Sequence, residues 1–137
     1  MSTMNSEVKD EVVAPELSPA RKRLERQSDS LATYEPFSFE GEAYHIKRLS
    51  YGGYVALGAN LLRGNPNFMK MPEIEQAKAT ISQALTECVY NESHAPFFGP
   101  GDAEAYIDDP AQSPFIAALY LQCNVVNPVI AKAKARA

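Results

Sequence analysis

The clearest hydrophobic pattern in the chain lies at residues 74–89 and predicts an amphipathic helix. Apolar residues recur three or four positions apart along this segment, and polar residues occupy the opposite face. Pro72 suits the start of a helix, and the glutamates that follow it favour the positive end of the helix dipole. The pattern predicts a helix from Pro72 to about Tyr90 or Asn91. Its apolar stripe is Ile74, Ala77, Ile81, Leu85, Cys88 and Val89.

Two shorter alternating runs upstream predict a β-hairpin. Residues 37–39 alternate, residues 40–42 contain a glycine and can turn the chain, and residues 43–49 alternate again with Tyr44 and Ile46 on one side. Because an isolated hairpin is marginally stable in water, we expect it to pack against helices.

The segment after the hairpin predicts a glycine-rich helix. Ser50 is a candidate N-cap, apolar residues between Tyr51 and Leu62 have helical spacing, and residues 64–67 end the helix. Each glycine inside this segment weakens a helix by about 1 kcal/mol relative to alanine. Such glycines are tolerated in a helix when a neighbouring backbone packs closely against them.

The C-terminal part of the chain predicts two more helices. Asp102 is a candidate N-cap for a short helix through Ile107. Ser113 is a candidate N-cap for a last helix, with Pro114 at its first position and Asn127 before a proline at its end. The apolar residues of this last helix are Phe115, Ile116, Leu119, Tyr120, Cys123 and Val126.

The predicted fold class is mainly α with a small N-terminal β-hairpin (α+β), in a compact helical domain of about four helices. This domain covers residues 36–128. Residues 1–35 are expected to form a flexible N-terminal extension, in which Ser18 and Pro19 can start a short helix that ends near Gln27. Residues 129–137 are expected to form a flexible basic C-terminal tail.

Composition limits the partners of this domain. The chain has 137 residues, of which 22% are charged, and its net charge of -4 argues against a dedicated nucleic-acid-binding protein. No apolar run approaches the ~20 residues that span a bilayer, and the polar, acidic N-terminus lacks the pattern of a secretory signal. We expect a cytoplasmic protein with no membrane and no nucleic-acid partner. The mixed-charge cluster at residues 21–26 leaves a nucleic-acid-binding regulator as a weaker alternative.

The residues that could carry chemistry lack the spacing of a known site. No nucleophile or carboxylate stands at motif spacing to His45 or His94, and Cys88 and Cys123 lack the C-x-x-C pattern. We expect free, buried thiols and histidines with surface or packing roles. The prediction is a protein that is not an enzyme, with no catalytic, cofactor-binding or metal site.

Three stretches of the chain, taken in order, resemble a known family. Residues 39–54 read as a strand followed by an Arg-Leu-Ser step into a helix, and residues 113–127 read as a helix that ends in Asn-Val-Val-Asn. Between them, a helix ends at residues 81–89 in a stretch that contains valine. A phenylalanine and then a short helix that begins with aspartate follow it, at Phe97, Phe98, Asp102, Ala103 and Ile107. This order is similar to that of the tail assembly chaperones of long-tailed (siphovirus-like) bacteriophages.

The resemblance implies a non-catalytic chaperone of viral morphogenesis. Such a protein would bind the tape-measure protein in the host cytoplasm, keep it soluble, help to recruit tail-tube subunits, and be absent from the mature virion. A small structural virion protein, such as a tail-completion or connector component, is the alternative that the sequence leaves open. Self-association is left open as well.

Under this interpretation, exposed apolar side chains would cover apolar stripes on a helical partner. The candidate partner-binding residues lie on the glycine-rich helix and in the loop that follows residue 93, and they are Tyr51, Tyr54, Leu61, Phe97 and Phe98. The same side chains would also suit the core, and both interpretations stand at this point.

Overall fold

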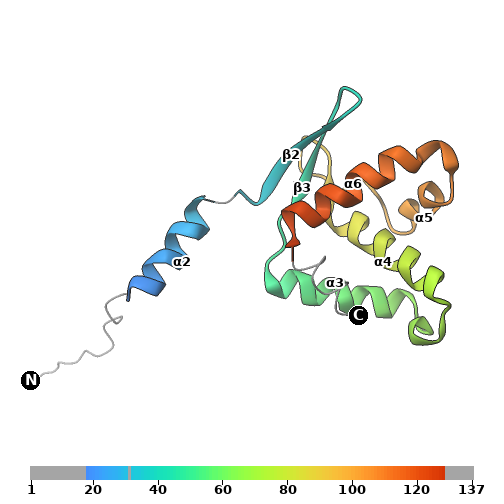
Figure 1. Cartoon of the computed structure of the whole chain (residues 1–137), viewed down its shortest axis with the longest axis horizontal. Coiled ribbons are helices and arrows are strands. Elements are labelled where there is room, and N and C mark those ends of the chain that lie inside the picture. Colours follow the sequence, from blue (N-terminus) through green and yellow to red (C-terminus); the bar gives the residue numbers. More distant parts are fainter. Residues whose placement is uncertain (1–17, 31, 129–137) are drawn as a thin grey trace, which may run out of the picture. The chain divides into compact units, whose positions relative to one another are not determined.

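The computed structural model describes residues 18–30 and 32–128, and the chain divides into two compact units, Met1–Ala32 and Thr33–Ala137 (Figure 1). The described part of the first unit is helix α2 (Pro19–Ser30), which runs a few residues beyond the predicted end near Gln27. The Ser18 hydroxyl oxygen accepts a hydrogen bond from the Arg21 backbone nitrogen at 3.2 Å, as expected of an N-cap. The predicted flexible C-terminal tail (residues 129–137) and residues 1–17 of the predicted flexible N-terminal extension (residues 1–35) lie outside the described residues.

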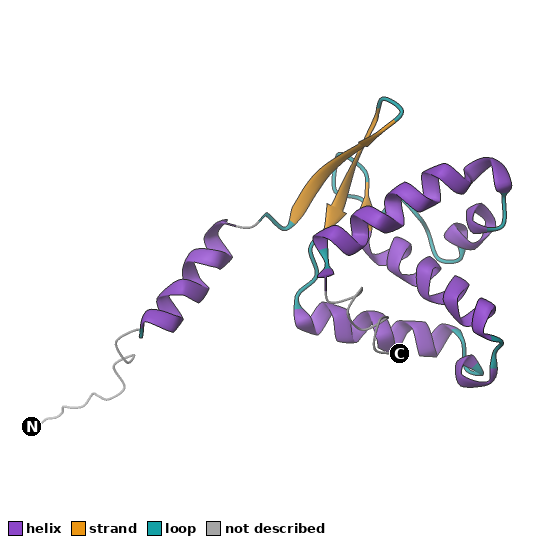
Figure 2. Ribbon diagram, in the orientation of Figure 1, coloured by secondary structure: helices purple, strands orange, loops and turns teal. Residues whose placement is uncertain are grey.

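A β-hairpin opens the second unit, as predicted (Figure 2). Strands β2 (Tyr34–Phe39) and β3 (Glu42–Lys47) pair antiparallel, with Phe39 opposite Glu42. The two residues between them, Glu40 and Gly41, have positive φ angles of 49° and 84°. Positive φ at both central positions is typical of a type I′ turn, whose twist matches that of paired strands.

A third strand was not predicted. Helix α4 (Glu73–Cys88) ends at Cys88, so its expected continuation to Tyr90 or Asn91 was wrong. Residues Val89–Tyr90 form strand β4, which pairs antiparallel with β3 and completes a sheet of order β2-β3-β4. Val89 and Tyr90 are residue types that favour strands, and pairing with Ile46 and His45 places them in register with the hairpin.

Helix α3 (Tyr51–Gly64) begins and ends as predicted. The Ser50 hydroxyl oxygen accepts a hydrogen bond from the Gly53 backbone nitrogen at 3.0 Å, and Asn65 is the C-cap. In the described part of the chain, no neighbouring backbone lies against the glycines at positions 52, 53 and 58. An added methyl group at Gly58 would meet no atom of another element within 4 Å, and at Gly53 the nearest atoms are side-chain atoms of Ser50 and Leu49.

The short 3-10 helix η1 (Phe68–Lys70) lies between α3 and α4. Helix α5 (Asp102–Ile107) comes after β4, and the 3-10 helix η2 (Pro110–Gln112) leads into helix α6 (Ser113–Val126). The predicted N-caps were wrong by one residue, since Gly101 and Gln112 occupy the cap positions. The Asp102 carboxylate instead accepts a hydrogen bond from the Gly99 backbone nitrogen at 2.9 Å, which closes the turn before the helix.

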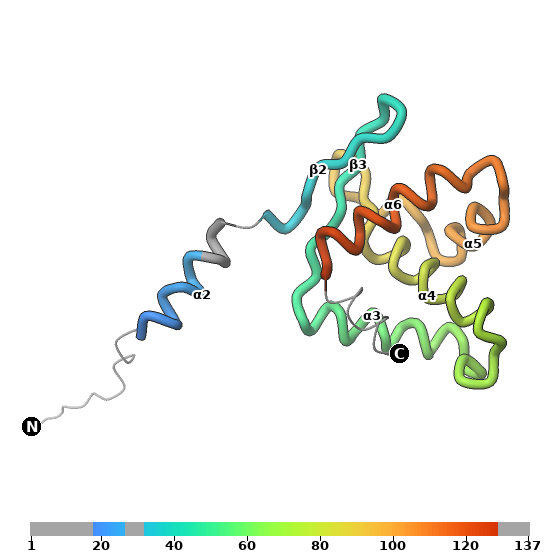
Figure 3. Tube along the Cα trace, in the orientation of Figure 1, coloured from blue at the N-terminus to red at the C-terminus, as the bar shows by residue number. Residues whose placement is uncertain are grey.

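The core lies where α4 meets the sheet and the other helices of the second unit. Helix α4 packs against α3, α5, α6 and β3, and the chain trace shows it passing between α3 and α6 (Figure 3). Its stripe is buried toward its C-terminal end at Leu85 and Cys88, whereas Ile74 at its start is 70% exposed. The largest fully buried side chains are Phe98, Ile46, Leu85, Leu119, Val89, Cys88 and Cys123. The predicted fold class, mainly α with a small sheet around one helical core, is confirmed.

Candidate partner-binding surface

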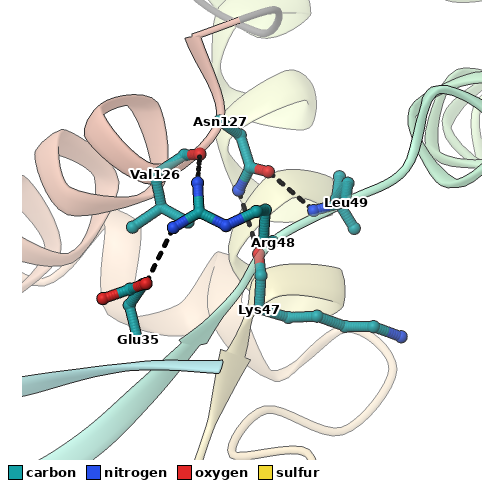
Figure 4. A network of polar contacts seen from close by, with 6 residues as sticks. All are labelled: Glu35, Lys47, Arg48, Leu49, Val126 and Asn127. Carbon is teal, nitrogen blue, oxygen red and sulfur yellow. Dashed lines mark hydrogen bonds and ion pairs between the residues drawn. The ribbon is translucent and has the colours of Figure 1, made fainter. Parts of the chain in front are cut away.

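Asn127 joins the end of α6 to the step between β3 and α3 (Figure 4). Its side-chain oxygen accepts a hydrogen bond from the Leu49 backbone nitrogen at 2.7 Å, and its side-chain nitrogen donates to the Lys47 carbonyl oxygen at 3.0 Å. Asn127 is buried, so these bonds satisfy an amide that would otherwise be costly to remove from water.

Arg48 reinforces the same junction. One guanidinium nitrogen donates to the Val126 carbonyl oxygen at 3.1 Å, near the end of α6, and another forms an ion pair with Glu35 on β2 at 2.7 Å. Because the last carbonyl groups of a helix lack partners within the helix, a cation at this position both satisfies and stabilises them. We call the contacts of Glu35, Lys47, Arg48, Leu49, Val126 and Asn127 the Asn127 network.

A mainly apolar hollow of about 220 Å³ lies beside the Asn127 network. Tyr51 and Tyr54, from the first turn of α3, stand on one side of it with their ring centroids 6.2 Å apart. The full lining is Arg48, Leu49, Ser50, Tyr51, Tyr54, Val126, Asn127 and Pro128. We call this hollow the tyrosine pocket.

Helices α3 and α6 are apolar on their exposed faces as well as on their buried ones. On each helix the exposed apolar side chains recur every three or four residues, so they share one helical face. Helix α6 contains no charged residue, and α3 contains only Arg63. The α3 stripe is Tyr51, Val55, Ala59 and Leu62, and the α6 stripe is Ala117, Leu121 and Val125.

An apolar exposed stripe is unusual for a surface helix, which normally turns charged and polar side chains to water. Large apolar patches on a protein surface mark contact sites for other molecules. The tyrosine pocket adjoins the α3 stripe, because Tyr51 belongs to both. Together these features form the candidate partner-binding surface.

The predicted partner-binding residues fall into two places. Tyr51 is 74% exposed and meets Tyr54 at the tyrosine pocket. Phe97 is 40% exposed and contacts the buried Phe98, with ring centroids 4.9 Å apart. Phe98 at 2% and Leu61 at 9% exposure contribute to packing and present almost no surface.

Phe97 and Phe98 belong to a row of aromatic rings on another part of the unit. Adjacent ring centroids in this row are 4.9 to 5.8 Å apart. Such spacing is that of attractive edge-to-face and tilted aromatic pairs. In order of contact, the row is Phe39, Phe115, Tyr44, Phe97, Phe98 and Tyr106.

The two histidines lie together, which their sequence positions did not indicate. The rings of His45 on β3 and His94 in the loop after β4 have centroids 4.6 Å apart. The Tyr34 ring stacks on the His94 ring, with centroids 3.9 Å apart. The His45 ring nitrogen Nδ1 donates to the Asn91 carbonyl oxygen at 3.3 Å. Stacking and a backbone hydrogen bond are packing roles, in line with the prediction for these residues.

The two thiols are free and buried, as predicted. A side-chain hydrogen bond with Cys88, followed by burial and the charge of that neighbour, raises the pKa of the Cys123 thiol well above its usual value of 9.0. A thiol that stays protonated is a poor nucleophile and a poor metal ligand. The two buried thiols lie in the core, where α4 packs against α6.

Within residues 18–30 and 32–128, no three or more histidine, cysteine, aspartate and glutamate side chains come together as a metal-binding group. In the same part of the chain, no helix combines the length and apolar character needed to cross a membrane. Comparison with known protein families, curated proteins and solved structures finds no match.

Sequence reasoning did not find the Asn127 network or the two exposed stripes. The signal for the stripes was present, since the segment of α6 has no charged residue and that of α3 has one. Helical spacing alone does not say which apolar face is buried. The Asn127 network joins residues about eighty positions apart, and no local pattern indicates such a contact.

Proposed function

We propose that this protein is a non-catalytic assembly chaperone that covers apolar helical segments of a longer partner. By its resemblance to the tail assembly chaperones of long-tailed bacteriophages, the partner would be the tape-measure protein, held soluble in the host cytoplasm. Recruitment of tail-tube subunits and absence from the mature virion belong to the same proposal.

The observation that carries this proposal is the apolar exposed side of α3 and α6. Tyr51, Val55 and Leu62 are exposed on one helix, and Leu121 and Val125 are exposed on the other. An amphipathic helix of a partner can bury its apolar stripe against such a surface, as in other helix-in-groove complexes. Because α6 is uncharged and α3 carries only Arg63, contact there would desolvate few charges.

Co-expression with a phage tape-measure protein tests the proposal. The chain should raise the soluble fraction of the tape-measure protein and co-purify with it. Replacing three residues of the α3 stripe (Tyr51→Ser, Val55→Ser and Leu62→Ser) should abolish both effects while the variant remains folded. Undiminished capture by this variant would overturn the proposal.

Met69→Ser is the matched control. Met69 in η1 is a large exposed apolar side chain outside both stripes. If any exposed apolar side chain could hold the partner, Met69→Ser would also weaken capture of the tape-measure protein. The proposal predicts that this variant captures the tape-measure protein as well as the original chain does.

Mass spectrometry of purified particles separates the chaperone from a structural virion protein. A chaperone that leaves during assembly is absent from finished particles. Recovery of this chain in fixed, stoichiometric copies would favour the structural alternative.

A further inference from the structure

A second hollow, of about 360 Å³, lies beside the turn of the β-hairpin. The hairpin contributes one wall, and η2 with the start of α6 contributes the other. The lining residues are Phe39, Glu40, Glu42, Tyr44, Ala111, Gln112, Pro114 and Phe115. We call it the hairpin pocket; it shares no lining residue with the tyrosine pocket.

Three aromatic rings line the hairpin pocket. The Phe115 ring lies 5.3 Å from that of Phe39 and 5.5 Å from that of Tyr44, centroid to centroid. Phe39 and Phe115 are half-buried, so part of each ring remains accessible. Accessible aromatic faces attract cations through the negative potential of their π-systems.

The charged groups of the hairpin pocket are carboxylates only. Glu40 and Glu42 are both exposed, and no lysine, arginine or histidine lines the pocket. Among the described residues, neither glutamate has an ion-pair partner within 4.0 Å, whereas Glu35 pairs with Arg48 and Asp108 pairs with Lys78. The pocket thus combines two uncompensated negative charges with aromatic walls.

The two segments that supply the lining residues contain no lysine or arginine to offset the negative field. Residues 33–46 and 92–128 contain no lysine and no arginine. The pKa of Tyr44 is raised, first by burial and then by the charges of Glu42 and Glu40, so the field of both carboxylates reaches the aromatic wall. An approaching cation would find no like charge in the pocket itself.

We propose that the hairpin pocket binds a lysine or arginine side chain of a partner polypeptide. The cationic head lies against the Phe39 and Phe115 rings and pairs with Glu40 and Glu42, and the aliphatic stem packs on Ala111 and Pro114. Arginine fits better than lysine, because its planar guanidinium both stacks on aromatic rings and pairs with carboxylates through two hydrogen bonds. This inference does not depend on the proposed chaperone function.

The identity of residue 40 agrees with this role. Its φ angle of 49° lies in the left-handed region, where glycine and asparagine are favoured and glutamate is not. Turn stability therefore does not explain a glutamate at this position.

The test uses the full chain and two short capped peptides, acetyl-Gly-Ala-Arg-Ala-Gly-amide and the same peptide with citrulline in place of arginine. Citrulline keeps the shape of arginine and removes its charge. Titration followed by NMR should shift the aromatic signals of Phe39 and Phe115 and the amide signals of residues 40–42 with the arginine peptide. We expect weak, saturable binding with a dissociation constant on the order of 1 mM, which weakens as salt is added.

The double variant Glu40→Gln and Glu42→Gln should bind the arginine peptide about tenfold more weakly or not at all. Both side chains are exposed at a turn, so the fold should be retained. The control Glu73→Gln with Glu104→Gln removes the same net charge from exposed positions outside the pocket and should leave binding unchanged. Equal binding of the citrulline peptide, unchanged binding by the first variant, or equal loss in the control would each overturn the proposal.

A basic segment of this same chain is the competing occupant. In the full chain without peptide, the triple change Lys132→Gln, Lys134→Gln and Arg136→Gln should leave the Phe39 and Phe115 signals in place. If that change moves those signals, the chain supplies its own cation and the assignment to a partner is wrong.

Discussion

The side-chain oxygen of Asn127 accepts a hydrogen bond from the backbone nitrogen of Leu49 at 2.7 Å, across 78 positions of sequence. The bond ties the end of α6 to the entrance of α3, and the Arg48 guanidinium adds a second link through the Val126 carbonyl oxygen. The Arg-Leu-Ser step at residues 48–50 and the Asn-terminated end of the last helix meet at this contact. It also forms one side of the tyrosine pocket, so the fold and the candidate surface share these residues.

Asn127→Ala should lower the free energy of unfolding by about 2–3 kcal/mol. The change leaves the Leu49 N–H and the Lys47 carbonyl without their partner in a part-buried junction, and an unmade bond of this kind costs about 1–3 kcal/mol. Urea titration monitored by circular dichroism measures the difference.

Asn67→Ala is the comparison for this change. Asn67 is exposed and its side chain does not cap η1, so its removal should change the free energy of unfolding by no more than about 0.5 kcal/mol. Equal stability of the Asn127→Ala variant and the original chain would show that the Asn127 network is not needed for folding.

Alkaline pH should destabilise the fold through Cys123. Its folded-state pKa is raised above the usual 9.0. The contribution of the buried thiol to the free energy of unfolding is therefore fully present below pH 9.0, and it is lost as the pH rises toward the folded-state pKa. Denaturant titrations from pH 7 upward should show stability falling beyond about pH 9.

Cys123→Ala isolates this contribution. The variant should be less stable at neutral pH because a buried side chain is shortened, but its stability should depend less steeply on pH above 9.0.

In the folded chain both thiols should resist iodoacetamide until denaturant is added. Rapid labelling at pH 8 without denaturant would contradict the burial of the two thiols.

The hairpin turn should respond in opposite directions to two substitutions. Gly41→Ala places a Cβ atom at a φ angle of 84° and should cost about 1 kcal/mol. Glu40→Asn introduces a residue that tolerates positive φ and should stabilise the fold by a few tenths of a kcal/mol to about 1 kcal/mol. Thermal unfolding measures both; destabilisation by Glu40→Asn would mean that the glutamate side chain supports the turn.

Local signals predicted most of the secondary structure. The Ser50 cap, the glycine-containing turn and the stop at Asn127 with Pro128 each depend on residues close in sequence, and each lies where it was expected. Of the apolar residues named for the last helix, Ile116, Leu119, Cys123 and Val126 are buried, and Phe115 and Tyr120 are half-buried.

The features that sequence did not predict depend on distant partners. Helical spacing continued through Val89, but pairing of Val89 with Ile46 ends α4 there and starts a strand. Which aromatic residues are buried and which are exposed also depends on contacts with distant parts of the chain. Phe97 and Phe98 are neighbours in the same loop, yet only Phe98 points into the core.

Site-specific photo-crosslinking tests the central claim, that the exposed side of α3 and α6 holds a helical partner. A photoreactive p-benzoylphenylalanine would replace Tyr51, Leu121 or, as the control position, Met69, in cells that also make the tape-measure protein. We predict crosslinks to the tape-measure protein from positions 51 and 121 and none from position 69. Crosslinks from position 69 alone, or none from either helix while the two proteins still co-purify, would contradict the account.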